Sequence, residues 1–182
     1  AAAAEEPPDP DAVALDLVFT DLCDTPPQLR HGTLREIQGL LEPAGVRVTG
    51  RTASPGESAP TGGVYVVLMP FDPSRPRTLP VGGVARRENG RQLTVWAFPP
   101  WVAGGLGLDL GQASRWTFRQ RVQFERAMAV VVVHELAHAH QGTVLPGETH
   151  ALEALEIRAR RAVEADDDRN VLLLALVVHE AL

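Results

Sequence analysis

The sequence predicts an α+β domain in which a small sheet forms mainly from the N-terminal half and most helices follow it. Apolar, β-branched segments of strand length lie at 14–22, 46–52, 64–69, 84–87 and 93–98. Helical apolar spacing occurs at 28–42 and then at 114–141, 148–164 and 168–181. Because the strand patterns are largely grouped before the helical ones, we expect a small twisted sheet, a buried helix and a C-terminal helical part.

The chain has room for one domain with its own core. Its 182 residues can bury enough apolar surface to fold without disulfides or a structural metal. The opening AAAAEEPPDPD is small, acidic and broken by prolines, which predicts a disordered leader over 1–12 and a single domain over 13–182. The same start can be read as the end of a cleaved export signal, and we expect a secreted or bacterial cell-envelope location; a cytoplasmic domain cut from a longer protein is the alternative.

Composition excludes several classes of partner. The 17 basic and 23 acidic residues give a net charge of −6, and no Lys/Arg block is interleaved with aromatics, so we expect no nucleic-acid partner. The apolar runs 127–133 and 171–178 are too short to cross a bilayer. Cys23 is the single cysteine, which excludes an intrachain disulfide and a thiolate cluster for zinc, and we expect it to be a small buried residue.

Local signals define the ends of the main elements. Turn formers at 24–27 separate the first strand from the helix at 28–42, which should end at Pro43 and Gly45. The segments 84–87 and 93–98 flank a polar turn and predict a hairpin, ended by Pro99 and Pro100. A glycine-rich stretch then leads to Ser114, the expected cap of a long helix that runs to Gln141 before Gly142.

The segment that carries chemistry is His134-Glu135-Leu136-Ala137-His138, which matches H-E-x-x-H. On a helix, residues four apart project from one face, so the imidazoles of His134 and His138 can reach the same tetrahedral ion. The apolar run before the motif predicts that this helix is buried. The pattern therefore predicts a Zn²⁺ site in which Glu135 is the catalytic base for the metal-bound water.

A third ligand is expected from the next helix. Glu148 heads the apolar stripe formed by Leu152, Leu155 and Ala159, where a lone carboxylate should be paired or bound to a metal. We therefore predict Glu148 as the third zinc ligand. His150 is the alternative, because it lies close by but further round the helix, and Glu153 is a weaker one.

Other residues near the motif have simpler interpretations. His140 follows His138 by two residues and should point away from the metal face. Tyr65, Arg158 and His179 are expected to be packing or surface residues rather than oxyanion donors. If the strand at 93–98 lies at the edge of the sheet, it could hold an extended peptide substrate by strand addition. The three tryptophans (Trp96, Trp101 and Trp116) are candidate walls of such a cleft, although ordinary core packing is the favoured interpretation.

Over roughly Val130 to Ala154 the chain resembles the gluzincin branch of the zincin metallopeptidases, in particular the minigluzincins and the peptidase domains of the ImmA/IrrE type. In those families a Glu on the helix after H-E-x-x-H completes the zinc site, and Glu148-Thr149-His150-Ala151 is similar to their E-x-x-A pattern. Leu152 departs from the Asp or Asn that many gluzincins carry four residues after the ligand. The metzincin pattern fails, because Gln141 and Val144 stand where Gly and His are needed.

The resemblance implies a zincin-like fold and the zinc-dependent hydrolysis of peptide bonds in a peptide or protein substrate. The rival interpretation is a catalytically inactive zincin-like module for binding or sensing. It is supported by Leu152 in place of the orienting Asp or Asn and by the lack of an identified Tyr or His for the oxyanion. A second rival is an α+β structural domain without metal. The sequence leaves substrate preference and oligomeric state open.

Overall fold

The structure, a computed structural model, describes residues 13–53, 57, 63–71, 83–88 and 92–141. The leader 1–12 and the predicted helices at 148–164 and 168–181 lie outside the described residues. Within them the chain is an α+β fold, as the sequence predicts.

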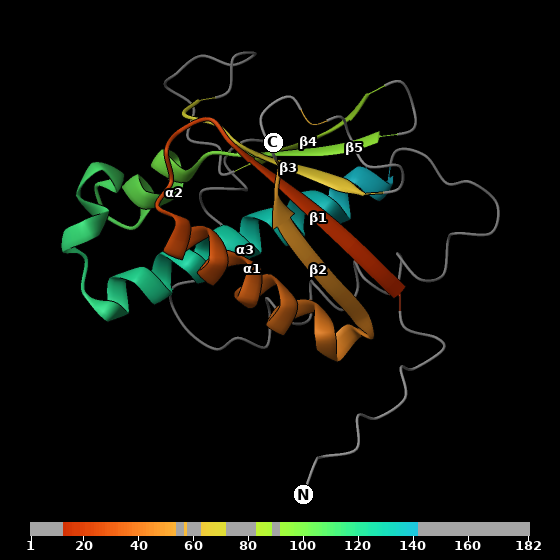
Figure 1. Ribbon diagram of the computed structural model, residues 1–182, viewed down its shortest axis with the longest axis horizontal. Helices are drawn as coiled ribbons and strands as arrows, with labels where there is room; N and C mark the ends of the chain where they lie inside the picture. The colour runs from red at the N-terminus through yellow and green to blue at the C-terminus, as the bar shows by residue number, and fades with distance from the viewer. Residues whose placement is uncertain (1–12, 54–56, 58–62, 72–82, 89–91, 142–182) are drawn as a thin grey trace, which may run out of the picture.

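The sheet is five-stranded and mixed (Figure 1). Its strands are β1 (Val13–Asp21), β2 (Val46–Thr52), β3 (Val64–Leu68), β4 (Gly83–Glu88) and β5 (Gln92–Ala97). They stand in the order β2-β1-β3-β5-β4, in which β2, β1, β3 and β5 are parallel and β4 is antiparallel to β5. All five strands, and the β4–β5 hairpin, are confirmed within a residue or two of the predicted ends.

One correction concerns the position of the hairpin. The strand at 93–98 is not an edge strand, because β5 pairs with β3 on one side and with β4 on the other. Because β5 pairs with β3 on its inner side, its hairpin partner β4 takes the outer position in the sheet. Among the described strands, β4 and β2 are therefore the edges of the sheet.

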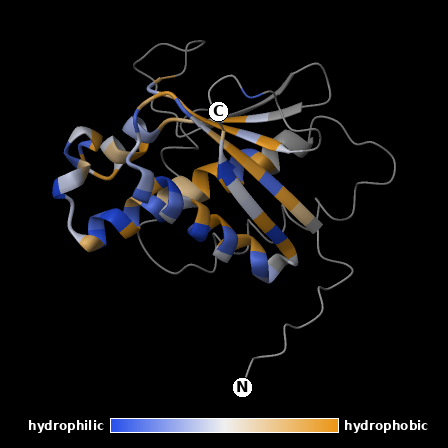
Figure 2. Ribbon diagram, in the orientation of Figure 1, coloured by the Kyte–Doolittle hydropathy of each residue, from blue (hydrophilic) through white to orange (hydrophobic). Residues whose placement is uncertain are grey.

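Two long helices cover one face of the sheet. α1 (Pro27–Leu41) and α3 (Phe118–Gln141) pack against each other, and both supply residues to the same core as alternate residues of the strands. In β3 these are Val64, Val66 and Leu68, and in β5 they are Val95 and Ala97. Figure 2 shows a hydrophobic stretch in the middle of α3, which corresponds to the apolar run 127–133.

The first helix ends where the sequence predicts. α1 is followed by the 3₁₀ turn η1 (Glu42–Ala44), and Gly45 then adopts a left-handed conformation with φ of 72°. A residue with a β-carbon is disfavoured at this angle, whereas glycine is not. Gly45 thereby turns the chain from α1 directly into β2.

The segment before α3 differs from the expectation. Pro99 and Pro100 end β5 but also begin a short helix, α2 (Pro99–Gly105), because proline suits the first turn of a helix. Ser114 lies in the 3₁₀ turn η2 (Leu110–Arg115) and does not cap the long helix. α3 begins only at Phe118, after the extended residue Trp116.

No helix among the described residues is long and apolar enough to cross a membrane, in agreement with the sequence.

Candidate metal centre

The H-E-x-x-H segment lies within α3, whose backbone is helical from Phe118 to Gln141. The prediction that His134 and His138 share one helix is therefore confirmed. Residues four apart on an α-helix lie one turn apart on the same face, which is the spacing that two imidazole ligands of one ion need.

A capping box sets the start of this helix. The Oε1 atom of Gln120 accepts a hydrogen bond from the backbone N of Thr117 at 2.8 Å, and the Gln120 N–H donates to Oγ1 of Thr117 at 3.3 Å. The sequence T-x-x-Q thus satisfies two backbone donors at the helix start. The start of α3 is consequently defined about four and a half turns before His134.

The accessible side of α3 follows helical spacing up to the motif. On this side of the helix, Arg126 is exposed and three residues are half-buried: Gln123, Val130 and His134. Residues 127–129 and 131–133 are buried. The four accessible positions are three or four residues apart and form one stripe along the helix. His134 continues this stripe, and position 138 is the next in the same series.

Glu135 directly follows His134, so its side chain projects from a neighbouring angle of the helix. It is only 8% exposed. Both residues interact with other groups, so neither is without a partner. The helix therefore presents an imidazole on its accessible stripe beside a carboxylate that is shielded from solvent.

The motif lies close to the β4 end of the sheet. α3 packs against both β4 and β5, and Figure 1 shows its C-terminal turns beneath this end. β4 is the antiparallel edge strand, a position that the sequence does not predict. Its position depends on which strand β5 pairs with, and no local signal encodes that choice.

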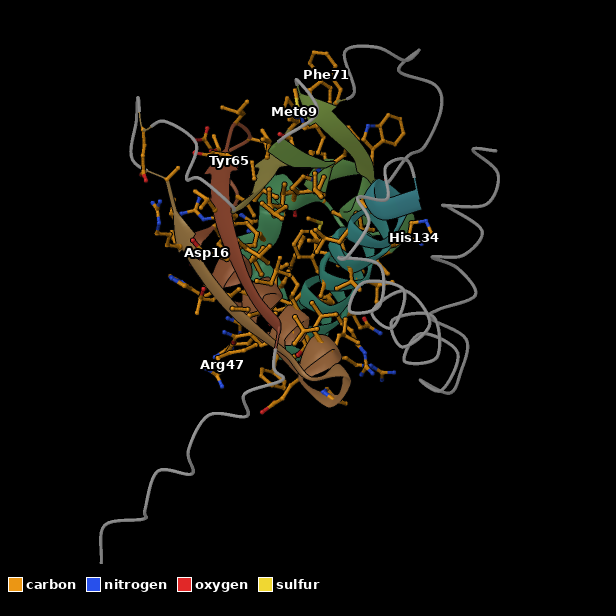
Figure 3. The ribbon with its side chains drawn as sticks, turned by 90° about the vertical axis from the view of Figure 1, so that its right-hand side faces the viewer. Asp16, Arg47, Tyr65, Met69, Phe71 and His134 are labelled. Atoms are coloured by element: carbon orange, nitrogen blue, oxygen red, sulfur yellow. The ribbon has the colours of Figure 1, made fainter. Side chains whose placement is uncertain are left out.

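The aromatic candidates lie elsewhere. Tyr65 and Trp96 alternate with core residues of β3 and β5, so they occupy the face of the sheet away from α3. Figure 3 accordingly shows Tyr65 and His134 on opposite sides of the strands. Trp116 is a core residue, 8% exposed, whose ring centroid lies 5.2 Å from that of Phe124. The core interpretation of Trp116 is confirmed.

The remaining candidate ligands lie outside the described part of the chain. Glu148, His150 and Glu153 follow Gln141, and the side chain of His138 is likewise outside it. Among the side chains that the structure does describe, no three His, Cys, Asp or Glu residues gather as a metal site. The third ligand thus stays a prediction, with Glu148 first and His150 as the alternative.

Comparison with models of protein families, with curated proteins and with solved structures finds no match to this chain.

Proposed function

We propose that this protein is a zinc-dependent metallopeptidase of the zincin type, in which His134 and His138 bind the metal and Glu135 is the general base. The observation that carries the proposal is the continuity of α3 through the H-E-x-x-H segment, with His134 on the accessible stripe of the helix and Glu135 shielded beside it.

The donor set suits zinc. Two neutral imidazoles from one helix and a carboxylate or a third imidazole from a later segment form a common catalytic zinc site that leaves one position open. Glu148 is our choice for that third ligand, and His150 is the alternative. A bound Zn²⁺ would polarise the scissile carbonyl and lower the pKa of its water ligand.

Glu135 is the proposed proton acceptor and donor. In the proposed reaction its carboxylate accepts a proton from the attacking water and later donates it to the amine that leaves the peptide bond. Shielding from bulk water supports this role, because a proton held by a buried carboxyl exchanges less readily with solvent before the leaving group takes it.

We assign the substrate strand to the β4 edge rather than to β5. An extended peptide can add to a sheet edge through main-chain hydrogen bonds, and β4 is the edge strand against which α3 packs. Such a peptide would run alongside the helix that carries His134, which suits a protein or peptide substrate better than a small molecule.

The test of the catalytic role is Glu135→Gln, assayed by cleavage of a quenched-fluorescent peptide library in the presence of zinc. We expect a loss of roughly 10²-fold to 10⁴-fold in rate with zinc content unchanged, because the amide cannot accept the proton but is not a metal ligand. Glu42→Gln, at an exposed position of η1, is the matched control and should retain activity. Equal rates in Glu135→Gln and wild type would refute the role of Glu135.

The alternative is an inactive zincin-like module that binds a peptide or senses metal. Tyr65, the one tyrosine in the sequence, faces away from α3 and cannot stabilise an oxyanion there, which gives this alternative its weight. A wild-type protein that binds zinc and peptides but cleaves none of the library would favour it.

A further inference from the structure

A carboxylate is packed between the two long helices, outside the candidate metal centre. Glu125 of α3 is 9% exposed and lies against Gly32, a buried residue of α1. A β-carbon at position 32 would lie 2.0 Å from Cδ of Glu125 and 2.3 Å from each of its carboxylate oxygens. The carboxyl group therefore occupies the space that a side chain at position 32 would need.

This position penalises the charged form of Glu125. Burial is the main reason that the pKa of Glu125 is raised above its ordinary value, and the negative charge of Glu36 raises it further. Arg35 and Arg121 lower it, but both are exposed, so water screens their effect. Among the described residues, α1 thus contributes Arg35 and Glu36 to the surroundings of Glu125, and α3 itself contributes Arg121.

Contact with Gly32 limits the hydration of the carboxyl group. An ionised carboxylate gains hydration if it moves away from Gly32, through rotation of its side chain or through a wider spacing of α3 and α1. A neutral carboxyl group stays beside Gly32 at lower cost.

We propose that Glu125 and Gly32 form a proton-sensitive latch between α1 and α3, in which the neutral carboxyl holds the two helices together and ionisation weakens their contact. The latch is independent of the proposed zinc chemistry, because it requires only the folded α1–α3 pair. It would nevertheless affect the metal centre, since His134 lies on the same rigid helix about 14 Å further along its axis.

The sign of the pH dependence follows from the raised pKa. The folded protein holds the Glu125 proton to a higher pH than the unfolded chain does. The stability from this group is therefore fully present below the unfolded pKa and declines as pH rises towards the folded pKa. Glutamine at this position keeps the shape of the neutral acid and should remove this decline.

The experiment compares urea unfolding of the full chain and of Glu125→Gln at pH values from 4 to 8. We expect the urea midpoint of the variant to exceed that of wild type by a margin that grows with pH, together with slower amide exchange in α1 at neutral pH. Glu42→Gln, an exposed control, should follow the wild-type profile. A margin that stays constant or shrinks with pH would overturn the proposal, as would equal amide exchange.

A second measurement does not depend on the folding of the variant. The carboxyl carbon of Glu125 in the wild-type protein, followed by ¹³C NMR, should titrate at a higher pH than the same carbon in urea. Titration at the same pH or lower would overturn the proposal. Gly32→Ala should displace the carboxyl group and bring the titration back towards the unfolded value.

Discussion

Asp21 joins the end of β1 to the first turn of α1. Its Oδ1 atom accepts hydrogen bonds from the backbone N of Cys23 at 3.1 Å and from Oγ1 of Thr25 at 3.3 Å, and its Oδ2 atom forms an ion pair with Arg30. The Sγ atom of Cys23 also donates to Oδ1, at 3.4 Å. Cys23 is half-buried in this turn rather than fully buried as expected.

This environment lowers the expected reactivity of the thiol. Burial raises the pKa of Cys23 from 9.0 to about 11, and the charge of Asp21 adds to the effect. At pH 8 the thiolate fraction should be about a hundredfold below that of the unperturbed thiol, so alkylation by iodoacetamide should be slower by about that factor than in urea. A native rate within a few fold of the rate in urea would contradict this account.

Residues of this kind show what the sequence could and could not reveal. The sequence indicates His134 and Glu135 as site candidates because the H-E-x-x-H pattern that contains them is five residues long and local. Asp21 and Glu125 carried no comparable signal. The contact of Glu125 with Gly32 joins residues that are far apart in the chain, and it follows from how α1 meets α3.

At the scale of elements, the sequence pattern predicts the strands and both long helices. It is wrong about the start of α3, which lies at Phe118 rather than at Ser114. Ser114 and Thr117 are both acceptable capping residues. Only Thr117 is followed three residues later by a glutamine that completes a capping box. The T-x-x-Q pattern is therefore the local signal in the sequence that marks the start of α3.

Replacement of the cap tests this assignment. Thr117→Ala removes the acceptor for the backbone N–H of Gln120 and should lower the free energy of unfolding by about 0.5–2 kcal/mol. Ser114→Ala should change it by less than about 0.5 kcal/mol, because Ser114 is an exposed residue of η2. Urea unfolding of the two variants beside wild type gives both values. A larger loss for Ser114→Ala than for Thr117→Ala would mean that α3 starts where the sequence first indicated.

At the scale of the whole molecule, the composition of the sheet was predictable but its strand order was not. Short apolar or β-branched segments between turn formers identify the strands, whereas the order β2-β1-β3-β5-β4 depends on pairings between distant segments. The order decides which strand we propose for substrate binding, because it puts β4 rather than β5 at the edge beside α3. The candidate site is likewise divided: one helix provides two predicted ligands and the base, and the third ligand belongs to a later segment.

Zinc content, measured by elemental analysis of the purified protein, tests the central claim that α3 carries a metal centre. We predict about one zinc per chain in wild type, loss in His134→Ala and His138→Ala, and retention in the control His140→Ala. Glu148→Ala should also lose zinc, and retention there with loss in His150→Ala would transfer the third position to His150. Wild-type protein without zinc after exposure to the metal, or zinc that survives both His134→Ala and His138→Ala, would contradict the account.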